Sequence, residues 1–172
     1  MQIEIRNEEE KHIDAVRDIV RAAFPTEAES KLVDALRANG KAVISLVAVS
    51  GENVLGHILF SPVSTTPPGE ARGLGLAPVA VHPEVQSQGI GSQLIREGLR
   101  VCKELGFDYC VVLGGPKYYR RFGFEKASAH GLKNEYGVDE EFMVIRFENG
   151  SPPAAVPGAL VKYAAEFGLF SV

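Results

Sequence analysis

A stretch in the middle of the chain, residues 79–92, has the residue types and spacing of a site that binds an anion. An apolar run ends there, two glycines follow at Gly89 and Gly91, and an amphipathic pattern then begins. Glycine lets a backbone approach a ligand closely, and a helix N-terminus carries unpaired N–H groups with partial positive charge. The stretch therefore predicts a phosphate or pyrophosphate site between a strand and a helix.

The spacing of the glycines separates three phosphate-binding patterns. The dinucleotide fingerprint G-x-G-x-x-G requires glycine where this chain has Leu94, and a Walker loop requires a Gly-Lys-Ser/Thr sequence that the chain lacks. The pattern that is present is Q-x-x-G-x-G, formed by Gln86, Gly89 and Gly91. Such a turn also occurs without a ligand, so the prediction depends on the strand before it and the helix after it.

The elements on either side of this loop form a parallel crossover. Residues 74–81 are an apolar run that predicts a strand, and an apolar stripe at helical spacing follows from Gly91 to Leu105. Residues 109–113 predict a second buried strand, so the unit reads strand–helix–strand. Pro78 cannot donate to a sheet ladder, and it predicts an interruption or bulge in the first strand.

The remaining pattern predicts an α/β fold, a mixed sheet with helices packed on it. Alternating or β-branched runs predict strands, apolar spacing of three and four predicts helices, and Pro/Gly clusters predict loops. The expected elements are a strand at 3–5, helices at 13–23 and 27–39, strands at 43–49 and 54–60 joined by a hairpin turn, a loop at 61–73, a short helix at 117–122, and strands at 142–147 and 160–163.

Composition sets the protein class. With 172 residues, 45% of them hydrophobic and 23% charged, the chain predicts a single globular domain over residues 1–172. A net charge of −4 with no basic patch argues against nucleic acid as a partner. Two cysteines without a CxxC pair predict neither a disulfide framework nor a metal site. No signal-like N-terminus and no membrane-length apolar run is present, so we expect a cytoplasmic protein with no membrane partner.

Two motifs together resemble the GNAT N-acetyltransferase superfamily. The first is the Q-x-x-G-x-G pattern at residues 86–91, between strand and helix. The second is residues 118–124, Tyr-Tyr-Arg-Arg-Phe-Gly-Phe, which look like the short helix that this family places after the second parallel strand. The specific motifs lie within residues 76–124, and the segments 57–62 and 75–91 are most similar to a bacterial branch of predicted acetyltransferases with undefined substrates.

This resemblance implies a fold, a co-substrate and a set of binding residues. In the family a central pair of parallel strands splays apart, and acetyl-CoA lies in the opening; here the strands would be 74–81 and 109–113. Main-chain groups of Val79, Ala80 and Val81 would hydrogen-bond the pantetheine, and Gln86 would close the loop or contact the phosphates. The amides that would hold the pyrophosphate belong to Ser87, Gln88, Gly89, Ile90, Gly91 and Ser92.

The implied reaction is direct attack of a neutral primary amine on the thioester. A main-chain N–H near Val81 would stabilise the charge on the thioester oxygen. By resemblance, Tyr119 is the catalytic residue, a general acid that protonates the leaving thiolate; aromatic packing is the other interpretation of this side chain. Tyr118 is expected to pack instead.

The general base is left open, with Glu84, His82, Glu29 or a chain of waters as candidates. His57 is expected to be a buried sheet histidine. Arg120 and Arg121 could meet the 3′-phosphate of CoA, although solvated charge explains them as well. Cys102 and Cys110 fit core positions, which argues against an acetyl-cysteine intermediate.

Three functions therefore compete, with transfer to a small-molecule amine first. The alternatives are acetylation of a protein N-terminus or lysine, and a non-catalytic module that senses acyl-CoA. The apolar residues 160–170 predict either a last strand with a packed tail or the edge of a homodimer.

Overall fold

The N-terminal strands form where apolar and polar residues alternate. The computed structural model describes residues 2–148 and 150–170. Strand β1 (Glu4–Asn7) pairs antiparallel with β2 (Ile44–Ser50), which pairs antiparallel with β3 (Asn53–Thr66). Ser50 faces Asn53 across the turn, and Gly51 there has a φ of 61°, which glycine adopts without strain. The predicted hairpin is therefore present.

The chain forms two compact units, which we describe separately. Unit 1 comprises Met1–Phe60, Ala77–Gly98 and Ala165–Val172, and unit 2 comprises Ser61–Leu76 and Leu99–Ala164. Three elements run without a break from one unit into the other: β3, β4 (Gly73–Val81) and α3 (Ile90–Glu104).

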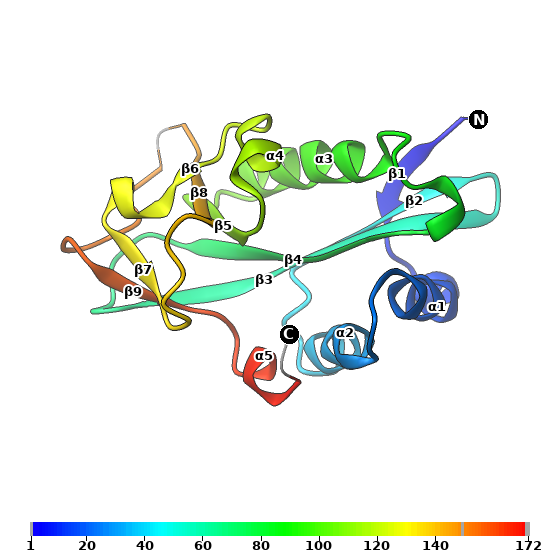
Figure 1. Cartoon of the computed structure of the whole chain (residues 1–172), viewed down its shortest axis with the longest axis horizontal. Coiled ribbons are helices and arrows are strands. Elements are labelled where there is room, and N and C mark those ends of the chain that lie inside the picture. Colours follow the sequence, from blue (N-terminus) through cyan, green and yellow to red (C-terminus); the bar gives the residue numbers. More distant parts are fainter. Residues whose placement is uncertain (1, 149, 171–172) are drawn as a thin grey trace. The chain divides into compact units, whose positions relative to one another are not determined.

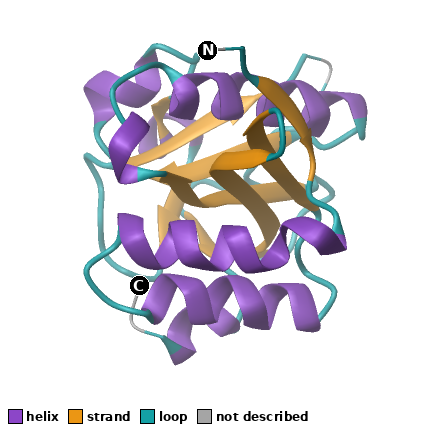
Figure 2. Ribbon diagram, turned by 90° about the vertical axis from the view of Figure 1, so that its right-hand side faces the viewer, coloured by secondary structure: helices purple, strands orange, loops and turns teal. Residues whose placement is uncertain are grey.

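In unit 1, helices cover strands through apolar stripes. Helix α1 (Ile13–Ala23) places its buried residues against β2 and Ala80 of β4, and α2 (Ala28–Ala38) lies beside it, as Figures 1 and 2 show. A last helix, α5 (Glu166–Leu169), packs against α2. Short 3₁₀ helices η1 (Glu10–His12) and η2 (Pro83–Val85) complete the unit.

In unit 2, β5 (Tyr109–Leu113) lies between β4 and β8 (Phe142–Arg146), parallel to the first and antiparallel to the second. Strand β9 (Ala159–Lys162) pairs with β3 on one side and with β7 (Leu132–Asn134) on the other. The other elements are α4 (Pro116–Arg120), β6 (Glu125–Lys126), which pairs with β8, and the 3₁₀ helix η3 (Ala127–His130).

The predicted mixed sheet with a parallel pair is confirmed, but several boundaries differ. Residues 61–66 were expected to be part of a loop at 61–73 because of Pro62, Pro67 and Pro68, yet β3 continues through residue 66 and pairs with β9 at residues 64–66. Pro62 is exposed and precedes that ladder, so its missing N–H costs no strand pairing there. Strands β6 and β7 and helix α5 were not predicted, because two to four residues are too few to show periodicity.

Strand β4 is also not interrupted at Pro78, contrary to the expectation from the proline. Its parallel ladder joins Gly73, Leu74 and Gly75 to Tyr109, Cys110 and Val111 and ends there, while β4 itself continues to Val81. The proline thus lies beyond the end of the ladder, where its missing N–H breaks no bond to β5.

The fold bears on two expectations, the dimer edge near β9 and the absence of a membrane-spanning segment. Strand β9 is paired along both sides, so residues 159–162 do not form the free edge that the dimer interpretation requires. Among the described residues, no helix has both the length and the apolar character to cross a membrane.

Candidate functional site

The loop after β4 closes on itself through a side chain. Gln86 donates a hydrogen bond from Nε2 to the carbonyl oxygen of Val81, 3.1 Å away, across the five residues of the turn. This is one of the two roles expected for Gln86. Inside the turn, Nδ1 of His82 accepts a hydrogen bond from the N–H of Glu84 and caps η2. These two hydrogen bonds give the loop a defined shape.

The backbone of this loop has two residues in the left-handed conformation, a feature of many anion-binding turns. Ser87 has a φ of 63° and Gly89 a φ of 84°, both in the left-handed region. A left-handed serine is uncommon and strained, and such strain often accompanies a binding site. Helix α3 begins at Ile90, and its first regular bond runs from the N–H of Gln93 to the carbonyl of Gly89 at 3.1 Å. The N–H groups before Gln93 have no acceptor within the helix and face outward from its positive end.

Close packing fixes the start of α3 on the strands of unit 1. A Cβ on Gly56 of β3 would lie 3.1 Å from Leu94 and 3.2 Å from Ile90. A Cβ on Gly98 would lie only 2.4 Å from the ring of Phe60, which is fully buried. These two glycines let the helix lie directly on β3, and the loop at its N-terminus is positioned as a result.

The surface of the loop is open, whereas the strand before it is covered. Residues 86–89 are exposed, no atom lies within 4 Å of a Cβ built on Gly89, and Ala80 is buried. All the predicted cofactor-binding residues therefore lie together in unit 1, as one continuous segment from β4 into the first turn of α3. Those residues are Val79, Ala80, Val81, Gln86, Ser87, Gln88, Gly89, Ile90, Gly91 and Ser92.

Tyr119 belongs to unit 2, on the short helix after β5. Its ring lies against the backbone of Gly114, where a Cβ would come within 2.3 Å of it. The ring also makes edge contacts with Tyr118 at 5.1 Å and Phe124 at 5.6 Å between centroids. Burial, followed by the charges of Tyr118 and Cys110, raises the pKa of Tyr119 to about 12. Its hydroxyl therefore keeps its proton at physiological pH and can donate it.

Tyr118 and Arg121 are close to Tyr119 in the sequence, but they lie on the surface beside Phe122. Tyr118 is partly exposed and packs edge-on against Phe122 at 5.3 Å, in keeping with the packing role expected for it. The guanidinium of Arg121 lies 5.3 Å from the centre of the Tyr118 ring and 5.6 Å from that of Phe122. Arg121 is thus held over aromatic rings on this surface.

The three side chains named as candidate bases have different surroundings. Nδ1 of His82 is occupied as a cap, and Glu29 lies in the first turn of α2 with the hydroxyl of Thr26 at 3.5 Å from its carboxylate. Glu84 is exposed.

His57 is the buried sheet histidine that the sequence predicts. It is fully inaccessible, with Nε2 at 2.8 Å from the hydroxyl of Ser45 and 3.7 Å from Glu8. Arg37 of α2 forms two hydrogen bonds with Glu8, at 2.8 and 3.0 Å, and so ties the helix to this part of unit 1. Burial lowers the pKa of His57 to about 4, although Glu8 opposes the shift.

The two cysteines are core residues, as expected. Both are fully buried, and burial together with the hydrogen bond to Cys102 raises the pKa of Cys110. A thiol held protonated is a poor nucleophile. Among the described residues, no group of three His, Cys, Asp or Glu side chains could hold a metal ion.

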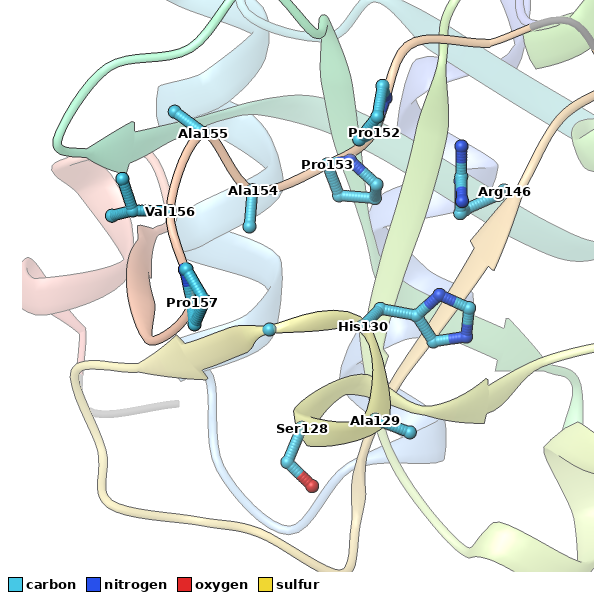
Figure 3. Close-up of a pocket in the computed structure, with 11 residues that line it drawn as sticks. Ser128, Ala129, His130, Arg146, Pro152, Pro153, Ala154, Ala155, Val156 and Pro157 are labelled. Atoms are coloured by element: carbon cyan, nitrogen blue, oxygen red, sulfur yellow. The ribbon is translucent and has the colours of Figure 1, made fainter.

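Unit 2 contains a shallow pocket of about 540 Å³ that no sequence pattern predicted. Figure 3 shows Arg146 and His130 on one side of it, and Pro153, Ala154 and Pro157 on the other. His130 lies 3.2 Å from the carboxylate of Glu125. The lining residues come from short, irregular segments, so no periodic pattern could have revealed this pocket.

Comparison with known proteins gives one family. A family model described as an acetyltransferase (GNAT) domain matches residues 4–127. An Escherichia coli K12 protein named uncharacterized N-acetyltransferase YhbS is 37% identical over 155 residues, covering 88% of this chain and 90% of YhbS. A second protein of that strain, named uncharacterized N-acetyltransferase YjhQ, is 35% identical over 130 residues, covering 73% of this chain and 72% of YjhQ.

Two solved structures have the same fold. The crystal structure of Escherichia coli YhbS in complex with CoA matches with a TM-score of 0.89 and 35% identity, over 98% of this chain and 93% of that one. A GNAT acetyltransferase from Brucella melitensis in complex with acetyl-CoA matches with a TM-score of 0.78 and 36% identity, over 96% and 98% of the two chains.

Proposed function

The chain belongs to the GNAT family of acetyltransferases, and we propose that it transfers the acetyl group of acetyl-CoA to the primary amine of a small molecule. The observation that carries this proposal is the loop at residues 86–92, closed by Gln86, left-handed at Ser87 and Gly89, and placed at the start of α3. The complexes of the two similar proteins with CoA and acetyl-CoA support it. The family model covers parts of both units, which supports one domain over residues 1–172.

Main-chain groups would do most of the binding. The amides of residues 87–92 would hold the pyrophosphate, because helix N-termini and left-handed turns direct N–H groups at an anion. The backbone of residues 79–81 would bind the pantetheine as an added strand. The end of the parallel ladder at Gly75, six residues before β4 ends at Val81, supports this second contact.

In the proposed reaction, acetyl-CoA supplies an activated thioester. A neutral amine nitrogen forms a bond to the carbonyl carbon, the carbon–sulfur bond breaks, and the proton lost by the amine balances the one gained by sulfur. A main-chain N–H near Val81 would stabilise the oxygen during attack. Tyr119 would donate its hydroxyl hydrogen to the departing sulfur.

The raised pKa of Tyr119 limits what it can do alone. With a hydroxyl pKa of about 12 and a thiol pKa of about 8.5, complete proton transfer to sulfur is uphill by about 5 kcal/mol. We therefore expect Tyr119 to stabilise the thiolate by a hydrogen bond and to transfer its proton only as another proton replaces it. The ammonium group formed in the reaction is the source of that proton.

The binding step is tested by calorimetric titration with acetyl-CoA, compared with CoA that lacks the 3′-phosphate. We expect one site per chain with a Kd in the micromolar range, about 8 kcal/mol. Gln86→Ala should weaken binding by about three- to ten-fold, since a single hydrogen bond is lost. Gln93→Ala, an exposed glutamine on α3, is the matched control and should bind like wild type. No heat at millimolar acetyl-CoA would refute the proposal.

A screen of acceptors then separates the alternatives. Acetylation of small primary amines, followed by mass spectrometry, is the expected result. Acetylation confined to peptide N-termini or lysines would identify a protein acetyltransferase instead, and tight acetyl-CoA binding without any transfer would identify a sensor. Light scattering on the same sample gives the oligomeric state, for which a homodimer would need a surface other than an edge of β9.

A further inference from the structure

The two walls of the pocket in unit 2 are joined by hydrogen bonds at both ends. At one end, the N–H of Gly158 donates to the carbonyl of Gly131 at 2.8 Å, next to the pairing of β9 with β7. At the other end, the N–H of Ser151 donates to Oδ1 of Asp108 at 2.9 Å. Three prolines lie between these ends, and each fixes the backbone φ at its position. The segment 151–158 is therefore a preformed wall.

The two walls differ in their chemistry. The wall at residues 152–157 carries only proline, alanine and valine side chains, and Val156 among them is 47% exposed. The opposite wall carries Arg146, the last residue of β8, and His130, the last residue of η3, as Figure 3 shows. The volume of about 540 Å³ is in the usual range for sites that bind small molecules. An apolar wall opposite a guanidinium suits an amphipathic anion.

The charge of Arg146 is available to a ligand. In the described part of the chain, no carboxylate lies within ion-pair distance of its guanidinium, which donates a long hydrogen bond of 3.4 Å to the carbonyl of Gly150. The acids next to it along the strands are engaged elsewhere. Glu148 lies 3.5 Å from Lys103, and Asp108 accepts main-chain hydrogen bonds on both of its carboxylate oxygens. A guanidinium has five N–H donors, so Arg146 can bind a carboxylate through two of them.

Two further basic side chains lie at this pocket. The ammonium of Lys133 on β7 lies 3.7 Å from a Cβ built on Gly158, next to the end of the apolar wall. Nε2 of His130 lies 3.2 Å from the carboxylate of Glu125, which holds the imidazole at the side of the pocket. The whole chain has a net charge of −4, so its overall composition does not explain a cluster of basic groups around one pocket.

The strand register distinguishes this pocket from the segment proposed to bind acetyl-CoA. Arg146 faces Tyr109 in the ladder between β8 and β5, and Tyr109 faces Gly73, the first residue of β4. The segment proposed to bind acetyl-CoA begins at Val79, near the other end of that strand. Arg146 is therefore level with the start of β4, whereas the acetyl-CoA segment lies at its end.

We propose that this pocket binds a small monocarboxylate with an apolar body, with the carboxylate on Arg146 and the body against residues 152–157. A guanidinium holds a carboxylate through two parallel hydrogen bonds, and the apolar wall removes the body of the ligand from water. An inorganic anion would not cover the wall, and a neutral molecule would not use the charge. The proposal adds a second ligand to the protein and does not depend on acetyl transfer.

Titration with benzoate, followed by NMR of the 15N-labelled protein, tests this inference. We expect the amide signals of Gly131 and Ala154 to shift with a Kd of about 1 mM or below. Benzamide has the same ring without the charge, and acetate has the charge without the ring. Each should bind at least about ten-fold more weakly than benzoate, because one of the two contacts is lost.

Two variants change the two walls separately. Arg146→Gln removes the charge and should weaken benzoate binding by about ten-fold or more, while benzamide binding stays the same. Val156→Asp places an opposing charge on the apolar wall and should abolish benzoate binding. Both side chains are exposed, so both variants should fold, and their thermal unfolding temperatures check this. Arg6→Gln, which removes an exposed arginine of β1, is the matched control and should bind benzoate like wild type.

Three results would overturn the inference. The first is an equal affinity for benzoate and benzamide, and the second is a benzoate affinity that Arg146→Gln leaves intact. The third is a set of shifts confined to residues 87–92 and abolished by CoA, since benzoate would then occupy the loop at the start of α3. None of these measurements includes acetyl transfer. Benzoate binding that depends on Arg146 therefore supports the inference even if acetyl-CoA gives no heat, an outcome that refutes only the transferase.

Discussion

At the scale of single residues, the surroundings of a side chain decide its chemistry more than its type does. Tyr118 and Tyr119 are adjacent, yet the first is open to solvent and the second lies on Gly114 with its pKa raised to about 12. His57 and His82 both lie on or next to strands of unit 1, yet one is buried with its pKa lowered and the other caps a 3₁₀ turn. Tyr119 combines a hydroxyl that burial keeps protonated with a place on the short helix after the second parallel strand.

Tyr119→Phe tests the role of this hydroxyl. We expect kcat to fall by about 10²- to 10⁴-fold, the usual contribution of a proton donor, while the Kd for acetyl-CoA stays unchanged because the ring still packs on Gly114. Steady-state kinetics and calorimetry on one preparation measure the two quantities. Tyr118→Phe is the matched control and should keep its turnover. Equal rates for Tyr119→Phe and wild type at every pH would exclude the hydroxyl from the reaction.

His57 gives a prediction about stability and pH. Its pKa is about 4 in the folded protein and about 6.5 when unfolded, so the unfolded chain binds the extra proton between these values. The contribution is present in full above pH 6.5 and is lost as pH falls toward 4, by about 2 kcal/mol at pH 5. Urea unfolding at pH 7 and pH 5 should show this loss in wild type and a smaller one in His57→Gln. Identical losses in both proteins would contradict the burial argument.

At the scale of elements, small residues determine how closely α3 approaches the strands. Gly56 and Gly98 remove the side chains that would separate the helix from β3. The N-terminus of α3 carries the candidate anion loop, so this close packing also determines where that loop lies. The position of the loop therefore depends in part on Gly56, thirty or more residues before it in the sequence.

Gly98→Ala measures this packing. Alanine improves helix propensity by about 1 kcal/mol, but its Cβ would lie 2.4 Å from the buried ring of Phe60, and overpacking costs about 1–3 kcal/mol. We expect a net loss in the free energy of unfolding, recovered in part by adding Phe60→Leu. Gly168→Ala in α5 meets no atom within 4 Å and should be neutral or stabilising. No recovery in the double variant would show that the ring is not the obstacle.

Sequence patterns predicted the long elements and missed the short ones, for physical reasons. Helices α1, α2 and α3 and strands β2, β4 and β5 each show several turns or repeats of one period, and all are present. The end of β3 was missed because of Pro62 and the two prolines that follow the strand, although Val63 and Thr65 alternate with exposed residues. The motif suggested two roles for Gln86, closing the loop or contacting the phosphates. Its hydrogen bond to the carbonyl of Val81 is the first of these. The contact between Tyr136 and Tyr163 could not be predicted, because it depends on the pairing of β9 with β7, and β7 is too short to show a period.

At the scale of the whole molecule, segments far apart in sequence complete each compact unit. In unit 1, the carboxylate of Glu166 on α5 accepts hydrogen bonds from Lys41 at 2.8 Å and Asn39 at 2.7 Å, just after α2. The hydrogen bond from Lys41, and then that from Asn39, lowers the pKa of Glu166. A residue near the end of the chain thus satisfies groups in its first quarter.

Glu166→Gln tests the strength of this tie. We expect the free energy of unfolding at pH 7 to fall by about 1–2 kcal/mol, less than for a fully buried charged bond because Lys41 is 38% exposed. A lowered carboxyl pKa stabilises the fold above about pH 4.5, and this contribution disappears as pH falls further. Urea unfolding should therefore separate the two proteins more at pH 7 than at pH 3. A difference that persists in acid would assign the loss to shape and not to charge.

Because β9 pairs with both β3 and β7, each of these strands has an unpaired edge until the ribosome has synthesised β9. Ser64, Thr65 and Thr66 of β3 pair along one edge with residues 160–162, and in the described part of the chain β7 pairs with residues 159–161. A ribosome that has released the chain through β8 therefore leaves two strands with open hydrogen-bonding edges, the kind of surface that pairs with other nascent chains. For this protein, the interval between translating residue 146 and residue 162 is when aggregation competes most directly with folding.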